Sequence, residues 1–550
     1  MIRYSPLSIL IFFLLSILPV LGQESIAEKD FRVHYYPTRL ELEFDKSKSP
    51  SSIKATDVFS KEEVEIEKIG NSNFFVIDSI KPSQFYNIEY TLNSTKTSVL
   101  SSTTIASKSA STGTITVYFN HIVDTSLSQT QNAVNLSNTL DDMLITYINN
   151  CVATLDIAIY NSYSPSATTG IASAINAAYA RGVQVRVIYD GSTSSVMIPL
   201  LNSAIPILAS PTSSSYAIMH NKFVVFDANS SNPNLPYVWT GSTNWTAVQI
   251  DGPDRNSVIT LQDQTLALAY TIEFEEMWGG SAATPNTATS KFGPYKTNNT
   301  PHNFIVGGKT VESYFSPSDG TTSKIITAIN SANTDIEIAV MNFTRSDISA
   351  ALLSRYSSGF TNINVLLDSS NPTGNQIGTL QAGLLANHAL VDSAPGIMHH
   401  KFMVIDNFNS ASDPLVLVGS HNWSTSAETK NDENTLIVHD TNVANQYFQA
   451  FASMYQIAGG TLSNIENTTD EKSVLKIVPN PNNGIFDIVS SNTMEHLDLV
   501  IYDVLGKRIA TKNFTSFNTT SMDLSTQTAG FYFIEATTDG KIYHYKFIKK

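Results

Sequence analysis

The chain has 550 residues, a formal net charge of −15 and a hydrophobic content of 42%. This length implies roughly three to four domains, and the hydrophobic content is enough for packed cores, which excludes a disordered protein. The acidic charge argues against a general polyanion-binding surface. The single cysteine, Cys151, excludes an intramolecular disulfide and a metal site of several cysteines, and its apolar context predicts a buried structural residue.

Residues 1–22 have the pattern of an export signal. Arg3 supplies a positive charge, an apolar run follows, and a cleavage-like site ends at Gly22. The alternative, a retained membrane anchor, is less favoured because the run is short for a membrane span. We therefore expect a signal peptide and a secreted protein.

Residues 30–105 alternate apolar and polar positions, as in RLELEFD and EVEIEKI. This period of two, broken by Pro, Asn, Ser and Lys clusters, predicts a small β-sandwich. The run SIKPSQFYNIEYTL resembles a strand pair of a fibronectin-type module. No catalytic motif occurs in it, so a spacer or adhesion module is the simplest interpretation.

The central part consists of two repeats, at 114–280 and 304–460. Each alternates apolar strands with helices in the same order, and each closes with a similar helix, at 270–280 and 449–460. This alternation implies parallel sheets covered by helices. The predicted fold class is α/β, with two homologous halves of mixed or parallel sheets flanked by small β-sandwich domains.

One short motif with a histidine, a lysine and an aspartate occurs in both repeats. Its residues are His220, Lys222 and Asp227 in MHNKFVVFD, and His399, Lys401 and Asp406 in MHHKFMVID. A GSxNW turn follows each copy at a similar distance, and its polar residues are Ser242 and Asn244, and Ser420 and Asn422. On a strand, the period of two places each histidine and lysine on one face and the aspartate on the other. The aspartates are therefore expected to be structural or to act from behind the histidines.

Two such motifs that face each other provide the groups needed to cleave a phosphodiester. Lysine ammonium groups, together with the Ser and Asn of the turns, can hold a phosphate and its developing charge. One neutral imidazole can attack phosphorus, and the other, when protonated, can donate to the leaving oxygen. This chemistry requires no metal and no other cofactor. Metal binding by His399 and His400 is a poor alternative, because adjacent strand residues point to opposite faces, so His400 is expected to be structural.

On these residues, the region 115–460 resembles the phospholipase D superfamily in its bipartite form, with two HKD motifs in one chain. The resemblance implies a pseudo-twofold α/β fold, a site between two phospholipase D-like halves, and cleavage through a phosphohistidine. Carried over residue by residue, it makes His220 the nucleophile and His399 the general acid and base. It also makes the lysines and the turn residues the phosphate-binding groups, and it implies a monomer, since both halves lie in one chain.

The family also places an acidic residue after the GSxN turn to orient the histidine. The second half has Glu433 there, 14 residues after Gly419. The same count from Gly241 reaches Arg255, whose neighbour Asp254 could substitute. The two halves are therefore expected to be unequal.

Three substrate and function classes remain open. The second turn resembles the endonuclease branch of the superfamily, but residues 111–465 contain 12 Lys and Arg against 25 Asp and Glu, a net charge of −13. A nuclease gains affinity from basic contacts along the backbone. We therefore favour a secreted phospholipase D acting on phospholipid at a membrane surface, over a metal-independent endonuclease acting on nucleic acid. A non-catalytic surface adhesion or scaffold protein is the third alternative.

Residues 474–550 contain VPNPNNGIFDI, IYDVLGKRI and DLSTQTAGFYFIEATTDG. These strands and their Pro-Asn-Pro, Leu-Gly and Gly-x-Tyr turns resemble the type IX secretion sorting domain. The resemblance implies the type IX secretion machinery as a partner, and export across the outer membrane to the cell surface or the medium. An ordinary carbohydrate-binding sandwich is the alternative.

Overall fold

The computed structural model describes residues 24–93, 98–213, 215–370, 373–385, 387–462, 475–480, 482–503, 507–538 and 541–550. The chain divides into two compact units, residues 1–462 and 463–550. The export signal expected at 1–22 lies outside the described residues. Within the described ranges, no helix is both long and apolar enough to cross a membrane.

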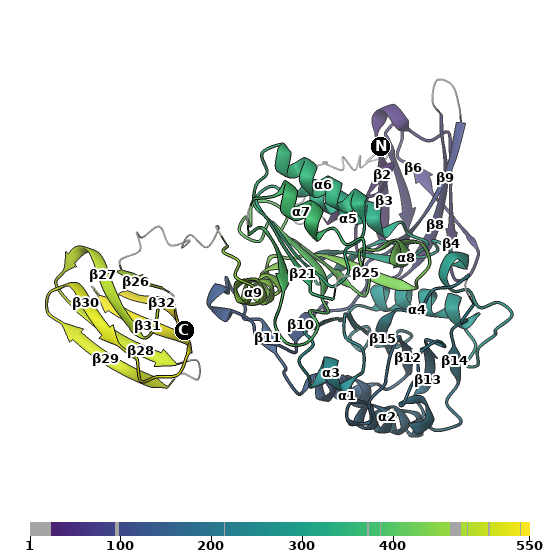
Figure 1. The fold of residues 1–550 in the computed structure, drawn as a ribbon. Coiled ribbons are helices and arrows are strands. Elements are labelled where there is room, and N and C mark those ends of the chain that lie inside the picture. The colour runs from purple at the N-terminus through teal and green to yellow at the C-terminus, as the bar shows by residue number, and fades with distance from the viewer. Residues whose placement is uncertain are drawn as a thin grey trace, which may run out of the picture. The chain divides into compact units, whose positions relative to one another are not determined.

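The chain first forms a β-sandwich of a five-stranded sheet, β1-β2-β3-β7-β6, and a four-stranded sheet, β5-β4-β8-β9 (Figure 1). Its strands are β1 (Ser25–Ala27), β2 (Phe31–Tyr35), β3 (Arg39–Phe44), β4 (Ser52–Asp57), β5 (Glu63–Val64), β6 (Glu67–Lys68), β7 (Phe74–Asp78), β8 (Phe85–Asn93) and β9 (Ser98–Ala106). The apolar residues of the alternating pattern fill the space between the two sheets, as in Val33, Leu42 and Ile88, which are fully buried.

The first repeat forms an eight-stranded sheet in the order β11-β10-β17-β16-β15-β12-β13-β14. Its strands are β10 (Ile115–Phe119), β11 (Val134–Asn135), β12 (Thr154–Ile159), β13 (Gln184–Tyr189), β14 (Ile207–Ala209), β15 (Lys222–Phe226), β16 (Tyr237–Gly241) and β17 (Ser257–Leu261). Its helices are α1 (Leu140–Asn150), α2 (Pro165–Ala180), α3 (Ala247–Ile250) and α4 (Gln264–Trp278).

The second repeat forms another eight-stranded sheet, in the order β18-β19-β25-β24-β23-β20-β21-β22. Its strands are β18 (Asn303–Val306), β19 (Lys309–Ser316), β20 (Ile336–Val340), β21 (Ile363–Asp368), β22 (Ala389–Asp392), β23 (Lys401–Ile405), β24 (Leu415–Gly419) and β25 (Glu433–His439). Its helices are α5 (Thr321–Ser331), α6 (Ser346–Ser357), α7 (Ile377–Gly383), α8 (Thr425–Thr429) and α9 (Thr441–Ile457).

The two sheets share one strand order from β10 to β14 and from β19 to β22, which confirms the predicted class of two homologous α/β halves. Of the mixed or parallel sheets that were predicted, the structure has mixed ones. Only β12, β13 and β14, and likewise β20, β21 and β22, run parallel within this order, whereas the motif strands β15 and β23 are antiparallel to their neighbours. Because these strands are buried on both faces, their apolar sequences do not reveal their direction.

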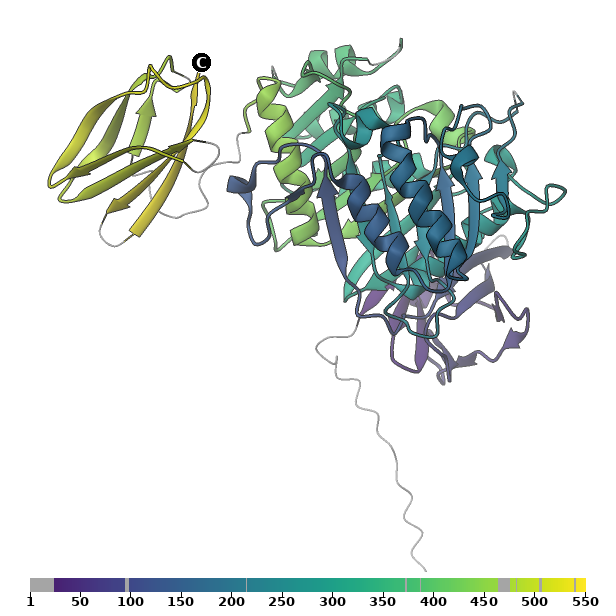
Figure 2. The same cartoon turned by 90° about the horizontal axis from the view of Figure 1, so that it is seen from below.

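The halves are stacked as layers around a shared core. Helices α4 and α9 pack on the inner faces of the sheets, and their aromatic residues, such as Tyr270 and Tyr447, belong to one cluster with Phe223 and Phe402 of the motif strands. Helices α1 and α2 cover the outer face of the first sheet, and α5 and α6 cover that of the second. Figure 2 shows α1 and α2 side by side on their sheet. This stacking brings the two motif strands to a common interface.

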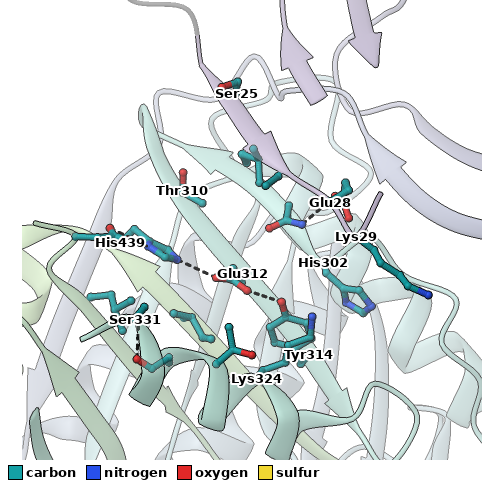
Figure 3. A pocket seen from close by; sticks show the side chains of 18 of the residues that line it. Ser25, Glu28, Lys29, His302, Thr310, Glu312, Tyr314, Lys324, Ser331 and His439 are labelled. Atoms are coloured by element: carbon teal, nitrogen blue, oxygen red, sulfur yellow. Dashed lines mark hydrogen bonds and ion pairs between the residues drawn. The ribbon is translucent and has the colours of Figure 1, made fainter. Parts of the chain in front are cut away.

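A polar cavity of about 710 Å³ lies where the N-terminal sandwich meets the second half (Figure 3). His439 is held there between Glu312, at 2.9 Å, and Asp413, at 2.9 Å, and these carboxylates raise its pKa to about 9 against the effect of burial. Glu28, from the segment after β1, accepts a hydrogen bond of 2.9 Å from Asn303. Burial raises the pKa of Glu28 to about 7. The junction is therefore built from titratable groups.

The second unit is a β-sandwich of two sheets, β26-β27-β30 and β29-β28-β31-β32. Its strands are β26 (Leu475–Val478), β27 (Ile485–Met494), β28 (Leu497–Asp503), β29 (Arg508–Phe514), β30 (Phe517–Asp523), β31 (Gly530–Thr538) and β32 (Lys541–Lys549). Phe486 and Phe547 pack in its core with their ring centroids 4.3 Å apart. Residues 463–474, just before it, lie outside the described residues.

Candidate active site

The two copies of the motif occupy equivalent places in the two sheets. β15 begins at Lys222 and β23 begins at Lys401, so each motif histidine lies two residues before its strand. Lys222 pairs with Ile159 of β12, and Lys401 pairs with Val340 of β20. The same strand register in both halves therefore brings the end of each motif strand to one site.

Each motif histidine is held by a side chain of the opposite half. His220 Nδ1 lies 2.7 Å from Glu433 Oε2, and His399 Nδ1 lies 2.9 Å from Asn256 Oδ1. A carboxylate accepts hydrogen bonds only, so Nδ1 of His220 carries the proton and Nε2 is left for the substrate. The site is complete only when both halves contribute to it.

Short backbone bridges between the halves keep each histidine beside its partner. The N–H of Asp432 donates to the carbonyl of Ile218 at 3.1 Å, next to Glu433 and close to His220. The N–H of His399 donates to the carbonyl of Arg255 at 2.9 Å, next to Asn256. The partner residue and its histidine therefore lie on paired backbone segments, which fixes their separation.

The partner in the first half corrects the sequence-based assignment. Counting from the turn glycine predicted Arg255, with Asp254 as a substitute, at the place equivalent to Glu433. The strand register places Asn256 there, because the first half has one more residue between the turn and β17. Arg255 forms an ion pair with Asp392, and Asp254 accepts a backbone N–H of the second half at 2.8 Å. The two halves are therefore unequal, as expected, but the residue equivalent to Glu433 is Asn256 and not Arg255.

The serines of the two turns orient the partner residues. The Ser242 hydroxyl donates to Asn256 Oδ1 at 3.1 Å, and the Ser420 hydroxyl donates to Glu433 Oε2 at 2.7 Å. A hydroxyl has one proton to donate. In this arrangement the proton of each serine is directed at the partner residue, and the phosphate-binding role of the two serines stays a prediction.

The lysines and asparagines are the polar groups left for a bound anion. Lys222 and Lys401 are fully buried, and each ammonium donates to the carbonyl of its own motif histidine at 2.8 Å. The side-chain oxygens of Asn244 and Asn422 are buried and accept no hydrogen bond from the described residues, so these side chains could hold an anion only by donating from their Nδ2 groups. Two ammonium groups and two amides thus remain as candidates to hold a phosphate.

The electrostatics show that these groups share one site. Burial lowers the pKa of His220 to about 4, the charge of Glu433 opposes this, and the charges of both lysines add to it. Burial and then the charges of Lys401 and Lys222 hold the pKa of His399 well below its ordinary value. Burial also lowers the pKa of Lys401 to about 7. The site therefore holds excess positive potential, which an anionic substrate would neutralise.

Glu433 stays ionised in this environment. Burial raises its pKa, but the charge and hydrogen bond of His220, and then the charge of Lys222, outweigh burial and bring the pKa below its ordinary value. Asn431 donates to the second carboxylate oxygen at 3.1 Å. Both carboxylate oxygens of Glu433 therefore accept hydrogen bonds, and Oε2 faces Nδ1 of His220.

The motif aspartates lie at the other end of the motif strands. A strand rises about 3.3 Å per residue, so the seven steps from histidine to aspartate correspond to roughly 20 Å. Asp227 accepts the backbone N–H groups of Val152 and Thr154 at 3.1 Å, and Asp406 accepts that of Thr334 at 2.7 Å. Each motif aspartate therefore anchors the loop before β12 or β20, which agrees with the structural role that the strand period predicts.

Cys151 belongs to the same anchoring loop. Its thiol is buried and lies 3.3 Å from Asp227 Oδ1. Burial, then the charge of Asp227, raise the pKa of this thiol above its ordinary value. The predicted structural cysteine is confirmed.

Two further aspartates, which the spacing of the motif did not reveal, position the histidines. Asp190 accepts the N–H of Met219 at 2.7 Å, and Asp368 accepts the N–H of Met398 at 2.7 Å. Each aspartate fixes the residue just before a motif histidine. Their signal was the Asp that ends the matching strand sequences VRVIYD and NVLLD in both repeats.

The His400 ring packs against His121 of the first half. Its Nε2 lies 2.8 Å from Nε2 of His121, and both rings are buried. This location agrees with the structural role expected for His400. Among the described ranges, no group of three or more His, Cys, Asp and Glu side chains is arranged to hold a metal ion.

The family comparisons match both repeats and the C-terminal unit. The family described as cardiolipin synthase, PLD-like domain, matches residues 144–278 and 325–455. The secretion system C-terminal sorting domain matches residues 476–550. The mitochondrial cardiolipin hydrolase of Xenopus tropicalis is 33% identical over 141 residues, which are 25% of this chain and 62% of that protein. The match thus spans just under two thirds of the cardiolipin hydrolase.

Two further matches are a curated relative and a solved structure. A phospholipase D of Rickettsia bellii is 30% identical over 145 residues, which cover 26% of this chain and 68% of that protein. The crystal structure of Nuc, a phospholipase D family member from Salmonella typhimurium, matches with 26% identity and a TM-score of 0.24, over 27% of this chain and 95% of that one.

Fold and site together define a duplicated α/β protein with one paired-histidine site shared by its two halves. The chain belongs to the phospholipase D superfamily. Its C-terminal sorting domain indicates export to the cell surface or the medium.

Proposed function

We propose that this chain is an exported phosphodiesterase of the phospholipase D type that hydrolyses phospholipid head groups through a phosphohistidine. The observation that carries the proposal is the exchange of partners between halves. His220 is fixed by Glu433 and His399 by Asn256, so two imidazoles from different halves are oriented into one site with both buried lysines.

The chemistry follows from the charges of these groups. A phosphodiester is an anion, and the two lysines with Asn244 and Asn422 would hold its oxygens and the charge that develops on them. One imidazole attacks phosphorus through Nε2 while the other gives a proton to the leaving oxygen. Water then attacks the phosphohistidine, and the second imidazole takes a proton from that water. Bound substrate supplies negative charge and so raises the low imidazole pKa that makes the second histidine a poor acid in the empty site.

Phospholipid is the substrate class that the charge of the molecule favours. The catalytic region, residues 111–465, has a net charge of −13, which opposes a long polyanion. A single phospholipid phosphate needs only the local positive potential of the buried lysines. The names of the relatives, a cardiolipin hydrolase and a phospholipase D, support the same class. Both catalytic halves lie in one chain, so we propose that the enzyme acts as a monomer.

A paired assay of the purified protein tests the proposal. The full chain is incubated with phosphatidylcholine vesicles, with cardiolipin vesicles and with single-stranded DNA, each with EDTA present. Release of a head group from either lipid supports the proposal. DNA cleavage without head-group release would replace the lipid substrate by nucleic acid, and no cleavage of any substrate would contradict catalysis and favour an adhesion role.

A further inference from the structure

The connector between the two repeats, residues 281–302, contacts the segment that leads into β25. It lies outside both stretches that match the family, residues 144–278 and 325–455. Within the connector, Gly293 donates its backbone N–H to Asp432 Oδ1 at 2.7 Å. The repeated motifs and the family match thus leave the role of the connector open.

The connector comes unusually close to this segment at Gly293. Its φ is 52°, a left-handed conformation that favours glycine. A Cβ at this position would lie 2.6 Å from the carbonyl oxygen of Lys430. The close approach therefore requires glycine, and it places the next connector residues against Asp432.

Lys296 of the connector is a buried cation between two carboxylates. Its side chain is fully buried, and its ammonium group forms ion pairs with Glu273 of α4 and, at 3.4 Å, with Asp432. Burial lowers the pKa of Lys296, but the charge of Glu273 and then that of Asp432 outweigh burial and raise the pKa above its ordinary value. The ammonium group therefore stays charged, and it links α4 of the first half to the residue just before Glu433.

Asp432 is also joined to the segment that carries His220. Its backbone N–H donates to the carbonyl of Ile218 at 3.1 Å. The next residue, Glu433, lies 2.7 Å from Nδ1 of His220. Asp432 therefore connects the buried cation to the hydrogen bond that orients this imidazole.

The first half has a charge of opposite sign at the equivalent position. Arg255 precedes Asn256, the partner of His399, and forms an ion pair with Asp392. Arg255 and Asp432 each form an isolated bridge with the methionine before a motif histidine. Each bridging segment is therefore fastened by an ion pair, but the cation of the second pair comes from the connector.

We propose that Lys296 is a positioning residue for the reaction, because its ion pair with Asp432 fixes the backbone from which Glu433 reaches the imidazole of the first motif. The inference rests on the proposed function. A displacement of about 1 Å caused far from the reacting atoms can lower a rate about 10²-fold. A buried ion pair is a strong restraint on position, since either charge left alone in the interior is costly.

Two isosteric variants on opposite sides of the lysine give the sharpest test. Asp432→Asn keeps an acceptor for the backbone N–H of Gly293 but loses the ion pair, so kcat for bis(4-nitrophenyl) phosphate should fall about 10–100-fold. KM should change by less than about threefold, because the groups proposed to hold the phosphate are intact. Glu273→Gln also removes one carboxylate from Lys296, on the side away from the active site, and should keep a kcat near that of wild type. Equal kcat values for the two variants would overturn the inference.

A double variant separates catalysis from stability. Lys296→Met leaves both carboxylates without their counter-charge and should lower both the unfolding midpoint and kcat. Adding Glu273→Gln removes one of these carboxylates and should restore part of the midpoint, whereas kcat should stay about 10–100-fold below wild type. Recovery of kcat together with the midpoint would show a lysine that acts only through folding, and the inference would be wrong.

Arg186→Met is the matched control for loss of a buried ion pair. It removes the partner of Asp156 inside the first sheet and should lower the unfolding midpoint. Its kcat, measured at a temperature at which every variant is folded, should stay near that of wild type. A loss of kcat as large as that of Lys296→Met would mean that any buried ion pair has this effect, which would contradict a specific role of the connector.

The same assays distinguish failure of the inference from failure of the proposed function. If the wild-type chain turns over neither a phospholipid nor the chromogenic diester, the proposed function is wrong. If the wild-type chain turns over and both Asp432→Asn and the double variant keep its kcat, only the positioning role of Lys296 is wrong.

Discussion

The two halves of the catalytic unit have the same strand order but place charge differently. In both, an Asp at the end of β13 or β21 fixes the residue before the histidine, and the motif aspartate anchors a loop. The differences lie in side chains at equivalent positions. Tyr160 lies beside His220, with ring centroids 4.7 Å apart, whereas the equivalent Met341 lies beside Lys401. Duplication thus retained the backbone geometry and left the electrostatics free to diverge.

A second difference lies inside the sheets, away from the site. Asp156 of β12 pairs with Arg186 of β13 at 2.7 Å in the first half. At the same register in the second half, Glu337 of β20 faces Asn364 of β21. Burial, together with the charge of Asp335, holds the pKa of Glu337 well above its ordinary value. One half therefore buries an ion pair, and the other buries a carboxyl group with a raised pKa beside an amide at the same place.

The strongest test removes one imidazole at a time. His220→Asn and His399→Asn should each lower turnover of phospholipid by roughly 10³-fold or more, because the two rings act as a unit. Head-group release from vesicles measures the effect. His400→Asn is the matched control, since the His400 ring is buried and its Nε2 lies 2.8 Å from Nε2 of His121. Near-normal rates for either motif variant would rule out the paired site.

Substitutions of Arg186 and Glu337 test the difference between the buried polar groups of the two sheets. Arg186→Met should destabilise the catalytic unit by about 3–5 kcal/mol, because it leaves the Asp156 carboxylate buried without its partner. Glu337→Gln removes no partner of a buried charge and should be at least as stable as wild type at neutral pH, because the raised pKa of Glu337 costs the wild type stability once the unfolded chain ionises. Denaturant unfolding of the full chain, followed by tryptophan fluorescence, measures both. Equal effects would show that the two sites are electrostatically alike.

Glu337 also predicts the direction of a pH effect. Its pKa in the folded protein lies above the unfolded value, so its contribution to stability is present below the unfolded pKa and is lost as pH rises through the folded pKa. Glu337→Gln should therefore be more stable than wild type at alkaline pH. An unchanged difference between the two proteins from pH 5 to pH 9 would contradict the raised pKa.

The buried lysines predict proton uptake when an anion binds. The pKa of Lys401 is about 7 in the empty site, and an oxyanion beside it would raise that value. Binding of vanadate at pH 7 should therefore take up protons, and affinity should fall up to about tenfold per pH unit above pH 7. Calorimetry in buffers of different ionisation enthalpy measures the uptake. Lys222→Met and Lys401→Met should each reduce it, and uptake that neither variant changes would assign it to other groups.

The smallest expected effect concerns Glu28, at the junction between the N-terminal sandwich and the second half. The pKa of Glu28 is about 7, above its ordinary 4.5, so its contribution to stability is present below pH 4.5 and is lost as pH rises to 7. Glu28→Gln should remove this dependence, measured as the shift of the thermal transition between pH 4.5 and pH 7.5. Ser25→Ala lines the same cavity without titrating and should behave as wild type.

The sequence was enough to predict the class of reaction and the motif residues. It was not enough to predict the residues that hold the motif histidines in place. His220, Lys222, His399 and Lys401 could be found because their spacing repeats, and repetition of a strand register brings them to one place. Asn256 could not be found by counting, because a loop one residue longer shifts the count while the strand pairing stays fixed. Hydrogen bonds across a sheet follow register, which sequence distance does not measure.

The serines of the turns show a second limit. Ser242 and Ser420 have the residue type that binds phosphate, but their one donor proton is directed at Asn256 and Glu433. Only the structure shows which acceptor a hydroxyl has taken. The direction of the motif strands was also hidden, because a strand buried on both faces has the same apolar sequence in either orientation.

The exchange of partners between halves has a consequence for inheritance. His220 and Glu433 are 213 residues apart, and His399 and Asn256 are 143 residues apart, yet each pair behaves as one unit. A substitution at position 256 acts on the histidine of the other half, so the two copies cannot drift independently after duplication. Among related chains, the residue at 433 should vary with that at 220, and the residue at 256 with the environment of 399.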